Sequence, residues 1–362
     1  MIRHFESPPL YVQGPNLLAR CGAYLGRVGV RLAVIADAVV EGIVRDPLER
    51  TAEEHDLDII FLQFGGECER GEVERLAALC LGVDAVVGAG GGRAVDAAKL
   101  VGDRVGIPVV SCPTVASTDA PVSRVAVLNH ADGSVEEIRL LSRSPALVLV
   151  DSQIVAAAPP RYLVAGMGDA MATWFEARAC WRAGGKTLFG HAPTWAGLSL
   201  ARQCWENLRR HAREALSQAQ AGVVGEALET VIETNILLSG LGFENGGLAL
   251  AHAIHNGLTR IPSTHEALHG EKVAFGLLVQ CVAEEAEEVE EVLSLLLGLG
   301  LPVTLGELGL ERSEEALFRV VEYVFEKETN KLENEPVQLS PEGLMEAMLR
   351  ADALGRAARS RG

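Results

Sequence analysis

Short apolar runs alternate with stretches of helical periodicity through the N-terminal part of the chain. The apolar runs lie at residues 31–37, 58–64, 84–90, 107–114, 125–129 and 146–151. Strands and helices that alternate at this spacing are typical of a parallel sheet with helices on both faces. We expect the last two runs, which flank the turn sequence ADGS, to add a hairpin and one further strand.

From about residue 161 onward the pattern changes to helical periodicity with almost no strand signal. Pro159 and Pro160 mark the change, because tandem prolines stop regular structure. We therefore expect two domains, an α/β domain over residues 1–160 and an all-α domain over 161–362. Within the second domain, residues 283–297 combine an acidic stripe with leucines at helical spacing, which predicts one solvated amphipathic helix.

Four of the nine histidines fall within eighteen residues: His252, His255, His265 and His269. The two pairs are spaced i,i+3 and i,i+4, so that each pair can share one face of a helix, and residues 256–264 predict a loop between the two helices. Imidazole is the commonest transition-metal ligand and the commonest acid or base near neutral pH. Any one histidine can equally cap a helix or occupy a satisfied polar position. The cluster therefore indicates a site without showing which members bind.

Asp169 stands in the sequence AGMGDAMATWFEA, near the predicted start of the helical domain. An aspartate at this place can be a helix N-cap. It can also supply the oxygen that a two-histidine metal site needs as its third protein ligand.

The sequence VVGAGGGRAVDAAK predicts a strand, a glycine turn and a helix in succession. Glycines let backbone amides approach a pyrophosphate, and the helix N-terminus adds a positive dipole end. A tight turn without a ligand would look the same. Asp37, at the end of an earlier predicted strand, favours a dinucleotide because its carboxylate can accept both ribose hydroxyls of an adenosine and repels a 2′-phosphate. Here too a helix N-cap is the alternative.

The segment PTVASTDAP follows the predicted strand that ends near Ser111. Its position is the carboxyl edge of the sheet, where open α/β sheets bind ligands. Thr114 and Ser117 can donate to a phosphate, and Asp119 can accept from a substrate hydroxyl. Without that context the segment would be a polar loop.

Composition narrows the classes of function. The 362 residues are 48% hydrophobic and carry a formal net charge of −17, which argues against nucleic-acid and anionic-membrane partners. The N-terminal sequence lacks the pattern of a signal peptide, and no apolar stretch is long enough to span a bilayer. Seven scattered cysteines without a CxxC pair suit reduced thiols. We therefore expect a cytoplasmic protein.

Five motifs together resemble the glycerol dehydrogenases, which belong to the metal-dependent, iron-containing (group III) alcohol dehydrogenase superfamily. They are GAGGGRAVDAAK, PTVASTDAP, LVAGMGDAMATWFEA, GLGFENGGLALAHAIHNGL and HGEKVAFG, in that order along nearly the whole chain. The resemblance weakens from ETNKLENEPVQLS onward. It implies the dehydroquinate synthase-like fold, in which an α/β NAD-binding domain with a parallel sheet precedes an all-helical metal- and substrate-binding domain.

The resemblance also implies the roles of particular residues. The metal ligands of the family fall on Asp169, His252 and His269, and its substrate-hydroxyl contact falls on Asp119; these four form the expected catalytic set. His255 and His265 are left with supporting roles. The expected cofactor-binding residues are Asp37, Gly91, Gly92, Arg93, Asp96, Thr114, Ser117, Ser123, Val125 and Asn129.

Three positions depart from the family pattern. Thr173 stands where iron-binding members carry a histidine, which leaves three protein ligands and favours zinc with open positions. Arg93 replaces a common lysine after the glycines, so that the charge is kept and its geometry changes. Asn129 replaces the usual tyrosine near the nicotinamide.

By resemblance, the chain would oxidise glycerol reversibly to dihydroxyacetone with NAD⁺ and one zinc ion per chain. Another vicinal diol or hydroxyketone is an alternative substrate, which the change at Asn129 keeps open. Glycerol 1-phosphate is a weaker one, because Arg260 and Lys272 near the histidines form no basic cluster. A non-catalytic relative would have lost a ligand or the glycine loop, and neither is lost. The resemblance further implies a homo-oligomer, by analogy an octamer.

Overall fold

The computed structural model describes residues 2–130, 134–310 and 314–361. The chain forms two compact units. The sheet unit comprises Ser7–Leu163 and Ser217–Gly240, and the helical unit comprises Met1–Glu6, Val164–Leu216 and Leu241–Gly362. The expected division into an α/β domain over residues 1–160 and an all-α domain over 161–362 stays a prediction.

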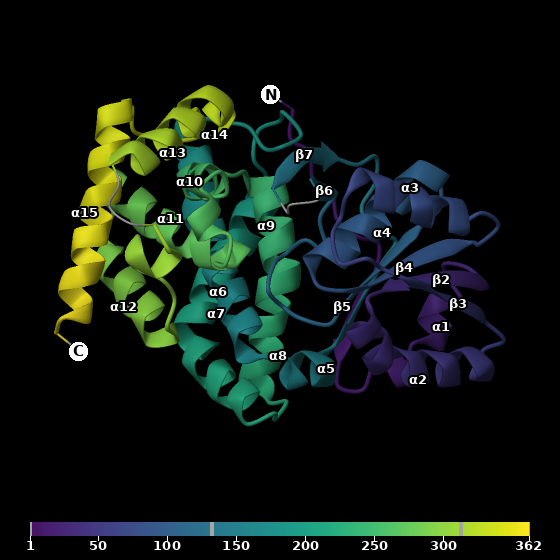
Figure 1. Ribbon diagram of the computed structural model, residues 1–362. Coiled ribbons are helices and arrows are strands. Elements are labelled where there is room, and N and C mark those ends of the chain that lie inside the picture. Colours follow the sequence, from purple (N-terminus) through teal and green to yellow (C-terminus); the bar gives the residue numbers. More distant parts are fainter. Residues whose placement is uncertain (1, 131–133, 311–313, 362) are drawn as a thin grey trace. The chain divides into compact units, whose positions relative to one another are not determined.

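The sheet unit contains a six-stranded parallel sheet, as the alternating apolar runs predicted (Figure 1). Its strands lie in the order β1-β8-β5-β4-β2-β3, and every neighbouring pair is parallel. The strands are β1 (Tyr11–Gly14), β2 (Arg31–Ala36), β3 (Asp58–Gln63), β4 (Ala85–Gly90), β5 (Val109–Pro113) and β8 (Leu147–Asp151). Strand β1 was not predicted, because its four residues YVQG are only half-buried and form no apolar run.

Helices cover both faces of this sheet because the central strands are apolar on both sides. In β2, Leu32 and Val34 belong to the core under α1 (Gly22–Leu25) and α2 (Ala38–Glu54). The alternate residues of the same strand belong to the core under α3 (Arg70–Leu79) and α4 (Gly92–Val105). This two-sided burial explains the continuous apolar runs in the sequence.

A separate antiparallel hairpin pairs β6 (Val125–Asn129) with β7 (Val135–Leu140). The expected hairpin therefore forms, but the partner of β6 is β7, whereas residues 147–151 join the parallel sheet. Residues 131–133 of the expected ADGS turn lie outside the described residues. Strand β7 was missed because its side chains alternate between half-buried and exposed and include two glutamates and an arginine.

The sheet unit also contains α5 (Ser152–Ala157), α8 (Glu226–Glu233) and the π-helical turn Thr234–Leu238. Glu229 of α8 connects them to the sheet, since its carboxylate accepts hydrogen bonds of 2.5 Å from Gln13 of β1 and from Ser152 of α5. The segment 217–240 is thus bound to the sheet although it lies far along the chain.

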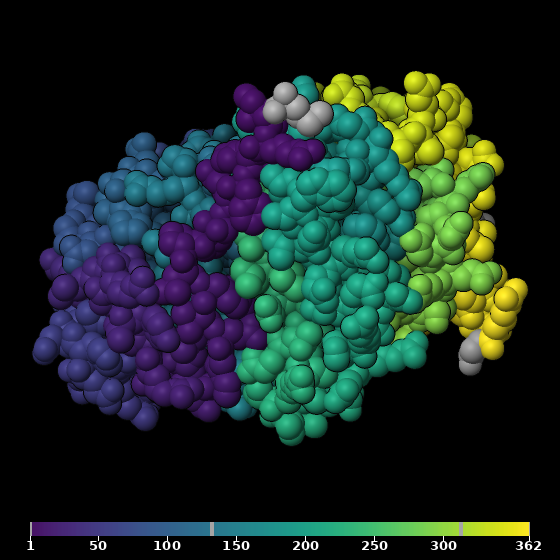
Figure 2. Space-filling model, turned by 180° about the vertical axis from the view of Figure 1, so that it is seen from behind, coloured from purple at the N-terminus to yellow at the C-terminus, as the bar shows by residue number. Residues whose placement is uncertain are grey.

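Within the described residues after Asp151, all regular elements are helices, which confirms the predicted helical C-terminal part. Helix α11 is buried along nearly its whole length, and α15 packs against α11 and α13. Figure 2 shows α15, in yellow, at the surface. The helices are α6 (Pro160–Ala183), α7 (Trp195–Gln220), α9 (Ser239–Gly246), α10 (Leu250–Leu258), α11 (His269–Ala283), α12 (Val289–Leu299), α13 (Glu314–Lys327), α14 (Thr329–Leu332) and α15 (Pro341–Arg359). None of the described helices combines the length and apolarity needed to cross a membrane.

The prediction of one continuous helix over residues 283–297 was wrong. Helix α11 ends at Ala283 and α12 begins only at Val289. Between them Glu285 adopts a left-handed conformation with φ 51°, and the Ala286 N–H donates back to the Cys281 carbonyl. This arrangement closes a helix C-terminus. The sequence conceals the break because a glutamate occupies a position that glycine usually marks.

Candidate metal centre and nucleotide loop

Asp169 lies in the middle of α6 with 1% of its surface exposed, so the alternative of a helix N-cap is wrong. Its neighbour Gly168 lets α6 and α11 touch. A Cβ on Gly168 would lie 2.5 Å from the Gly270 carbonyl oxygen, and one on Gly270 would lie 1.8 Å from the Ala165 carbonyl oxygen. Because neither position has room for a side chain, the two backbones pack directly, and Asp169 comes next to the first residue of α11.

His252 and His255 share α10 as predicted, but His265 and His269 do not share a helix. His269 is the first residue of α11, and its turn is fixed by the Leu268 N–H, which donates 2.7 Å to the Glu271 carboxylate. His265 lies before that start at an exposed position, where its Nε2 is 3.1 Å from the Thr259 carbonyl oxygen. The i,i+4 spacing misled because a helix boundary falls between the two histidines.

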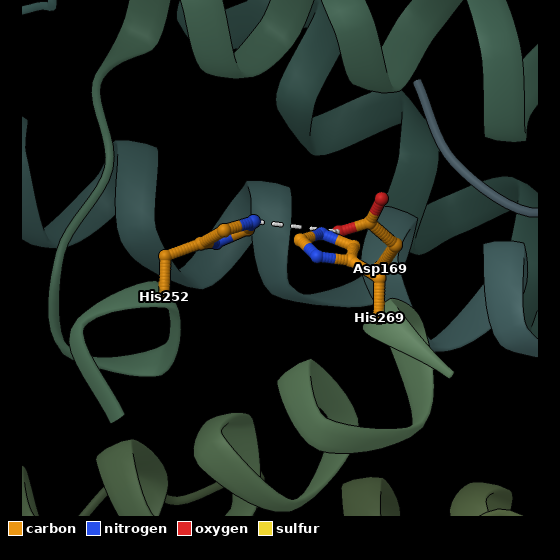
Figure 3. Close-up of side chains that lie close together, drawn as sticks. All are labelled: Asp169, His252 and His269. Atoms are coloured by element: carbon orange, nitrogen blue, oxygen red, sulfur yellow. Dashed lines mark hydrogen bonds and ion pairs between the residues drawn. The ribbon is translucent and has the colours of Figure 1, made fainter. Parts of the chain in front are cut away.

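Three side chains converge at the start of α11, and Figure 3 shows both imidazoles directed at one carboxylate. Asp169 Oδ1 is 3.4 Å from His252 Nε2 and 3.2 Å from His269 Nε2. The donor atoms of the three residues all lie within 4.8 Å of one another. Among the described residues, this is the group of histidine, cysteine and acidic side chains that could hold a metal ion.

This donor set fits a metal ion. Ligand atoms around a four-coordinate zinc ion with bonds of about 2.0–2.1 Å lie roughly 3.3 Å apart, close to the two separations found here. Asp169 Oδ2 is buried and has no hydrogen-bond partner within the described part of the chain. A buried carboxylate oxygen without a partner is costly, and a cation would compensate it.

The charges in this group reinforce one another. Burial raises the pKa of the Asp169 carboxyl, but attraction to His269 and hydrogen bonds with both imidazoles outweigh burial and hold this pKa below its ordinary range. Burial lowers the pKa of His252, but the charge of Glu176 and hydrogen bonds with Asp169 and Glu176 raise it to about 10. The Asp169 and Glu176 carboxylates therefore stabilise positive charge on the imidazoles that they contact.

Glu176 was missed by the sequence analysis. It lies two helical turns after Asp169 on α6, is fully buried, and places Oε2 2.6 Å from His252 Nδ1. Its other oxygen accepts the backbone N–H groups of Ala249 and His252 at 2.8 and 2.9 Å. The i,i+7 spacing of two acids in a helix that is otherwise mostly apolar was the available signal.

His255 lies beside the candidate ligands. Its Nε2 is 2.9 Å from His269 Nδ1, and burial together with the charges of His269 and His252 lowers its pKa well below 6.5. His255 is therefore neutral near pH 7.

Thr173, one turn after Asp169, is buried, and its methyl carbon occupies the space that a Cβ on Gly242 would need.

The glycine turn lies where β4 meets α4. Gly90 has φ +142°, and Gly91 precedes the helix without a side-chain cap. A Cβ on Gly92 would approach Thr118 Oγ1 at 3.5 Å and the Ala120 Cβ at 3.9 Å, so that glycine keeps a gap open between the helix N-terminus and the following loop. Free space beside unshielded amides suits a phosphate group.

Asp37 is the N-cap of α2, and its Oδ1 accepts the N–H groups of Val39 and Val40 at 2.9 Å. The structure therefore shows that Oδ1 of Asp37 caps the helix, as the alternative interpretation predicted. A second role toward a ribose stays a prediction.

The loop with Thr114, Ser117 and Asp119 is held by the segment 217–240. Asn235 donates 3.0 Å to the Ala116 carbonyl oxygen, and Ser239 Oγ donates 2.7 Å to Asp119 Oδ2. Sequence analysis missed both residues, because their contacts join positions about 120 residues apart.

Asp96, Ser123 and Val125 meet around a fully buried lysine. Lys99 donates 3.2 Å to Asp96 Oδ1 and 2.6 Å to the Val125 carbonyl oxygen, and it also donates to the Ala120 carbonyl. Ser123 Oγ is 3.5 Å from the same Val125 oxygen. Asp96 Oδ2 accepts the Val127 N–H at 3.1 Å. Asp96 and Lys99 therefore hold the loop against α4.

Arg93 and Asn129, two of the departures from the family pattern, contact the same carboxylate. Asn129 Nδ2 donates 2.6 Å to Glu67 Oε1, and Arg93 lies 3.2 Å from Glu67 Oε2. Asn129 is buried, whereas Arg93 is mostly exposed. The two departures are thus structurally linked through a residue that the sequence analysis did not single out.

Comparison with known proteins shows the family to which the chain belongs. Residues 8–152 match the model of iron-containing alcohol dehydrogenases. A glycerol dehydrogenase of Escherichia coli O6:H1 is 43% identical over 360 residues, covering 98% of each chain. The chain belongs to the iron-containing alcohol dehydrogenase family. It is therefore an oxidoreductase with the fold of this family.

Two further comparisons describe its place within this family. A glycolaldehyde reductase of Halobacterium salinarum is 42% identical over 361 residues, covering 99% of each chain. The crystal structure of a probable glycerol dehydrogenase from Sinorhizobium meliloti superposes with a TM-score of 0.92 at 40% identity, covering 98% of this chain and 100% of that one. The fold predicted from the five motifs is confirmed over nearly the full length.

Proposed function

We propose that this family member catalyses the reversible oxidation of glycerol to dihydroxyacetone, with NAD⁺ as hydride acceptor and one zinc ion per chain. The single observation that carries the proposal is the convergence of His252 and His269 on the buried carboxylate of Asp169, one oxygen of which has no partner in the described part of the chain. Relatives called glycerol dehydrogenases at 42–44% identity over nearly the full length support glycerol as the substrate.

In this proposal Asp169, His252 and His269 hold the metal. Zinc, when bound, would polarise a substrate hydroxyl so that its proton leaves near neutral pH. Three protein ligands leave room for substrate oxygens, which suits a polyol with adjacent hydroxyls. The choice of zinc over iron is favoured by Thr173, which cannot ligate as a histidine would.

The sheet unit would bind NAD(H). The turn at Gly91 and Gly92 would receive the pyrophosphate on the N-terminus of α4, and Asp37 would accept the ribose hydroxyls. The remaining expected contacts, Arg93, Asp96, Thr114, Ser117, Ser123, Val125 and Asn129, belong to this same unit and stay predictions. NAD⁺, when held by these residues, would supply the hydride acceptor for the reaction.

Asp119 would orient a substrate hydroxyl by accepting its hydrogen bond. The Ser239 hydroxyl holds one oxygen of this carboxylate at 2.7 Å, so that its orientation is fixed before substrate arrives. Such preorganisation contributes to rate by positioning the reacting groups.

Reduction of a small hydroxyaldehyde or hydroxyketone is the second candidate. The glycolaldehyde reductase among the relatives is about as similar as the glycerol dehydrogenases are. The contact of Asn129 with the Glu67 carboxylate keeps this candidate open, because the tyrosine usual in the family would replace that polar contact near the expected nicotinamide position.

We further propose that the protein acts in the cytoplasm as a homo-oligomer.

The test is a substrate panel on protein that has been stripped of metal and reloaded with zinc. Glycerol, other C3–C4 diols, dihydroxyacetone and glycolaldehyde are assayed with NAD(H) and NADP(H). We expect no turnover without metal and the highest kcat/KM for glycerol or dihydroxyacetone. Full activity of the metal-free protein would refute the mechanism, and a strong preference for glycolaldehyde would select the second candidate.

A further inference from the structure

A chain of hydrogen bonds leads away from His269 through α10. His269 Nδ1 is 2.9 Å from His255 Nε2, and His255 Nδ1 is 2.9 Å from Asn256 Oδ1. Asn256 Nδ2 donates 2.9 Å to Glu328 Oε1, and Lys331 donates to the other oxygen of Glu328. Glu328 lies just before α14 with 5% of its surface exposed, and Lys331 with 8%.

The direction of this chain is fixed at Glu328. A carboxylate that pairs with a lysine ammonium is ionised and can only accept hydrogen bonds. Asn256 must therefore present its NH₂ group to Glu328 and its carbonyl oxygen to His255. The oxygen and nitrogen of an asparagine amide have similar shapes, so the orientation of the Asn256 amide is assigned from its hydrogen-bond partners.

The same logic continues through both imidazoles. Facing a carbonyl oxygen, His255 Nδ1 must carry a proton, and in a neutral imidazole the Nε2 must then be an acceptor. His269 Nδ1 must donate to that acceptor. A neutral His269 consequently has its lone pair on Nε2, the atom that lies 3.2 Å from Asp169 Oδ1 within the candidate metal group.

We propose that Glu328 is a positioning residue that selects, through Asn256 and His255, the nitrogen which His269 offers to a metal ion. The inference rests on the proposed function, since it assumes that the group of Asp169, His252 and His269 binds zinc. The inference adds Glu328, which is connected to the candidate ligand His269 through the side chains of Asn256 and His255. Burial supports the role, because little water can compete for the hydrogen bonds of Glu328 and His255.

Glu328→Gln tests the direction of the chain. A glutamine has one oxygen, and the buried Lys331 ammonium needs that acceptor more than the neutral Asn256 does. The glutamine NH₂ group then faces Asn256, which must turn its oxygen toward it. His255 Nδ1 becomes an acceptor, its proton moves to Nε2, and His269 is left with its proton on the metal-facing nitrogen.

Glu335→Gln is the matched control. Glu335 is similarly buried, at 7% exposure, and also contacts α10, where it accepts the Leu250 N–H at 2.8 Å, but it lies off the chain to His269. A glutamine there keeps this acceptor. We therefore expect the control to retain the histidine tautomers and the zinc affinity of the wild type.

Two readouts are made on purified full-length protein. The first is the ¹⁵N chemical shift of His255 in metal-free, ¹⁵N-histidine-labelled protein near pH 8. We expect Nδ1–H in the wild type and the control, and Nε2–H in Glu328→Gln. The second is zinc affinity by competition with a chelator, which we expect to fall about tenfold in Glu328→Gln alone.

The outcomes separate this inference from the proposed function. Wild-type protein that takes up no zinc contradicts the proposed function. Wild-type protein that binds zinc, with an unchanged His255 tautomer in Glu328→Gln, overturns the role of Glu328. If Glu328→Gln does not fold by circular dichroism, Asn256→Leu serves instead, because it removes the acceptor of His255 and leaves Glu328 paired with Lys331. A His255 fixed as Nδ1–H in that variant would equally overturn the inference.

Discussion

Glu176 Oε2 lies 2.6 Å from His252 Nδ1 inside the helical unit. The carboxylate takes the hydrogen bond of one ring nitrogen and leaves the other, Nε2, directed at Asp169. Carboxylates in this position orient metal-binding histidines and raise their basicity. The two candidate histidine ligands are thus oriented differently: His252 directly by a carboxylate, and His269 through a neutral imidazole.

Glu176→Gln should weaken zinc binding. The Oε1 atom of Glu176 already accepts two backbone N–H groups, so the glutamine oxygen is expected to stay there. Its NH₂ group would then face His252 Nδ1 and move the ring proton to Nε2. Loss of such a partner typically costs 10–100-fold in metal affinity. Chelator competition measures the loss, Glu335→Gln again serves as the control, and equal affinities of the two variants would contradict the role of Glu176.

The stability of the metal-free protein should fall as pH rises above neutrality. In the folded protein the pKa of His252 is raised from 6.5 to about 10, so the unfolded chain loses this proton first. The stabilisation is complete below pH 6.5 and disappears as the pH approaches 10, at no more than about 1.4 kcal/mol per pH unit. Denaturant unfolding at pH 6, 8 and 9.5 measures it. His252→Gln, which cannot titrate, should lack this part of the decline.

The sheet was predictable because burial on both faces gives each central strand an unbroken apolar run. Residues 31–36 and 85–90 show this directly. Strands β1 and β7 escaped because partial burial leaves no such run. Likewise, the break at Glu285 escaped because it depends on a backbone conformation that glutamate rarely adopts.

The candidate site was predictable only in part. The histidine cluster follows from the sequence, but the choice of His252 and His269 and the pairing with Asp169 depended on the family resemblance. The spacing of Glu176 from Asp169 was a local signal, but the contacts of Glu176 and Glu328 could not be found locally, because their partners on α10 lie 76 and 72 residues away. A buried carboxylate leaves no periodic pattern that would reveal its partner.

Lys99→Met should destabilise the sheet unit. The change leaves the buried Asp96 carboxylate without its lysine and removes the donor to the carbonyl oxygens of Ala120 and Val125. Breaking one partner of a buried ion pair typically costs about 3–5 kcal/mol. Urea unfolding measures the loss, and Lys327→Met at an exposed position should change little. A loss below about 1 kcal/mol would show that the pair contributes little to the loop.

Two substitutions at Asp37 should separate its capping role from its proposed role toward the cofactor. The carboxylate caps α2 through Val39 and Val40, and serine can keep these hydrogen bonds without the charge. Asp37→Ser should therefore preserve the unfolding free energy while narrowing the preference for NAD⁺ over NADP⁺, because repulsion of the 2′-phosphate is removed. Asp37→Ala should narrow the preference equally and also lose about 1 kcal/mol of stability. The ratio of kcat/KM for the two cofactors, measured beside urea unfolding, distinguishes the roles. If Asp37→Ser left that ratio unchanged, Asp37 would be a helix cap alone.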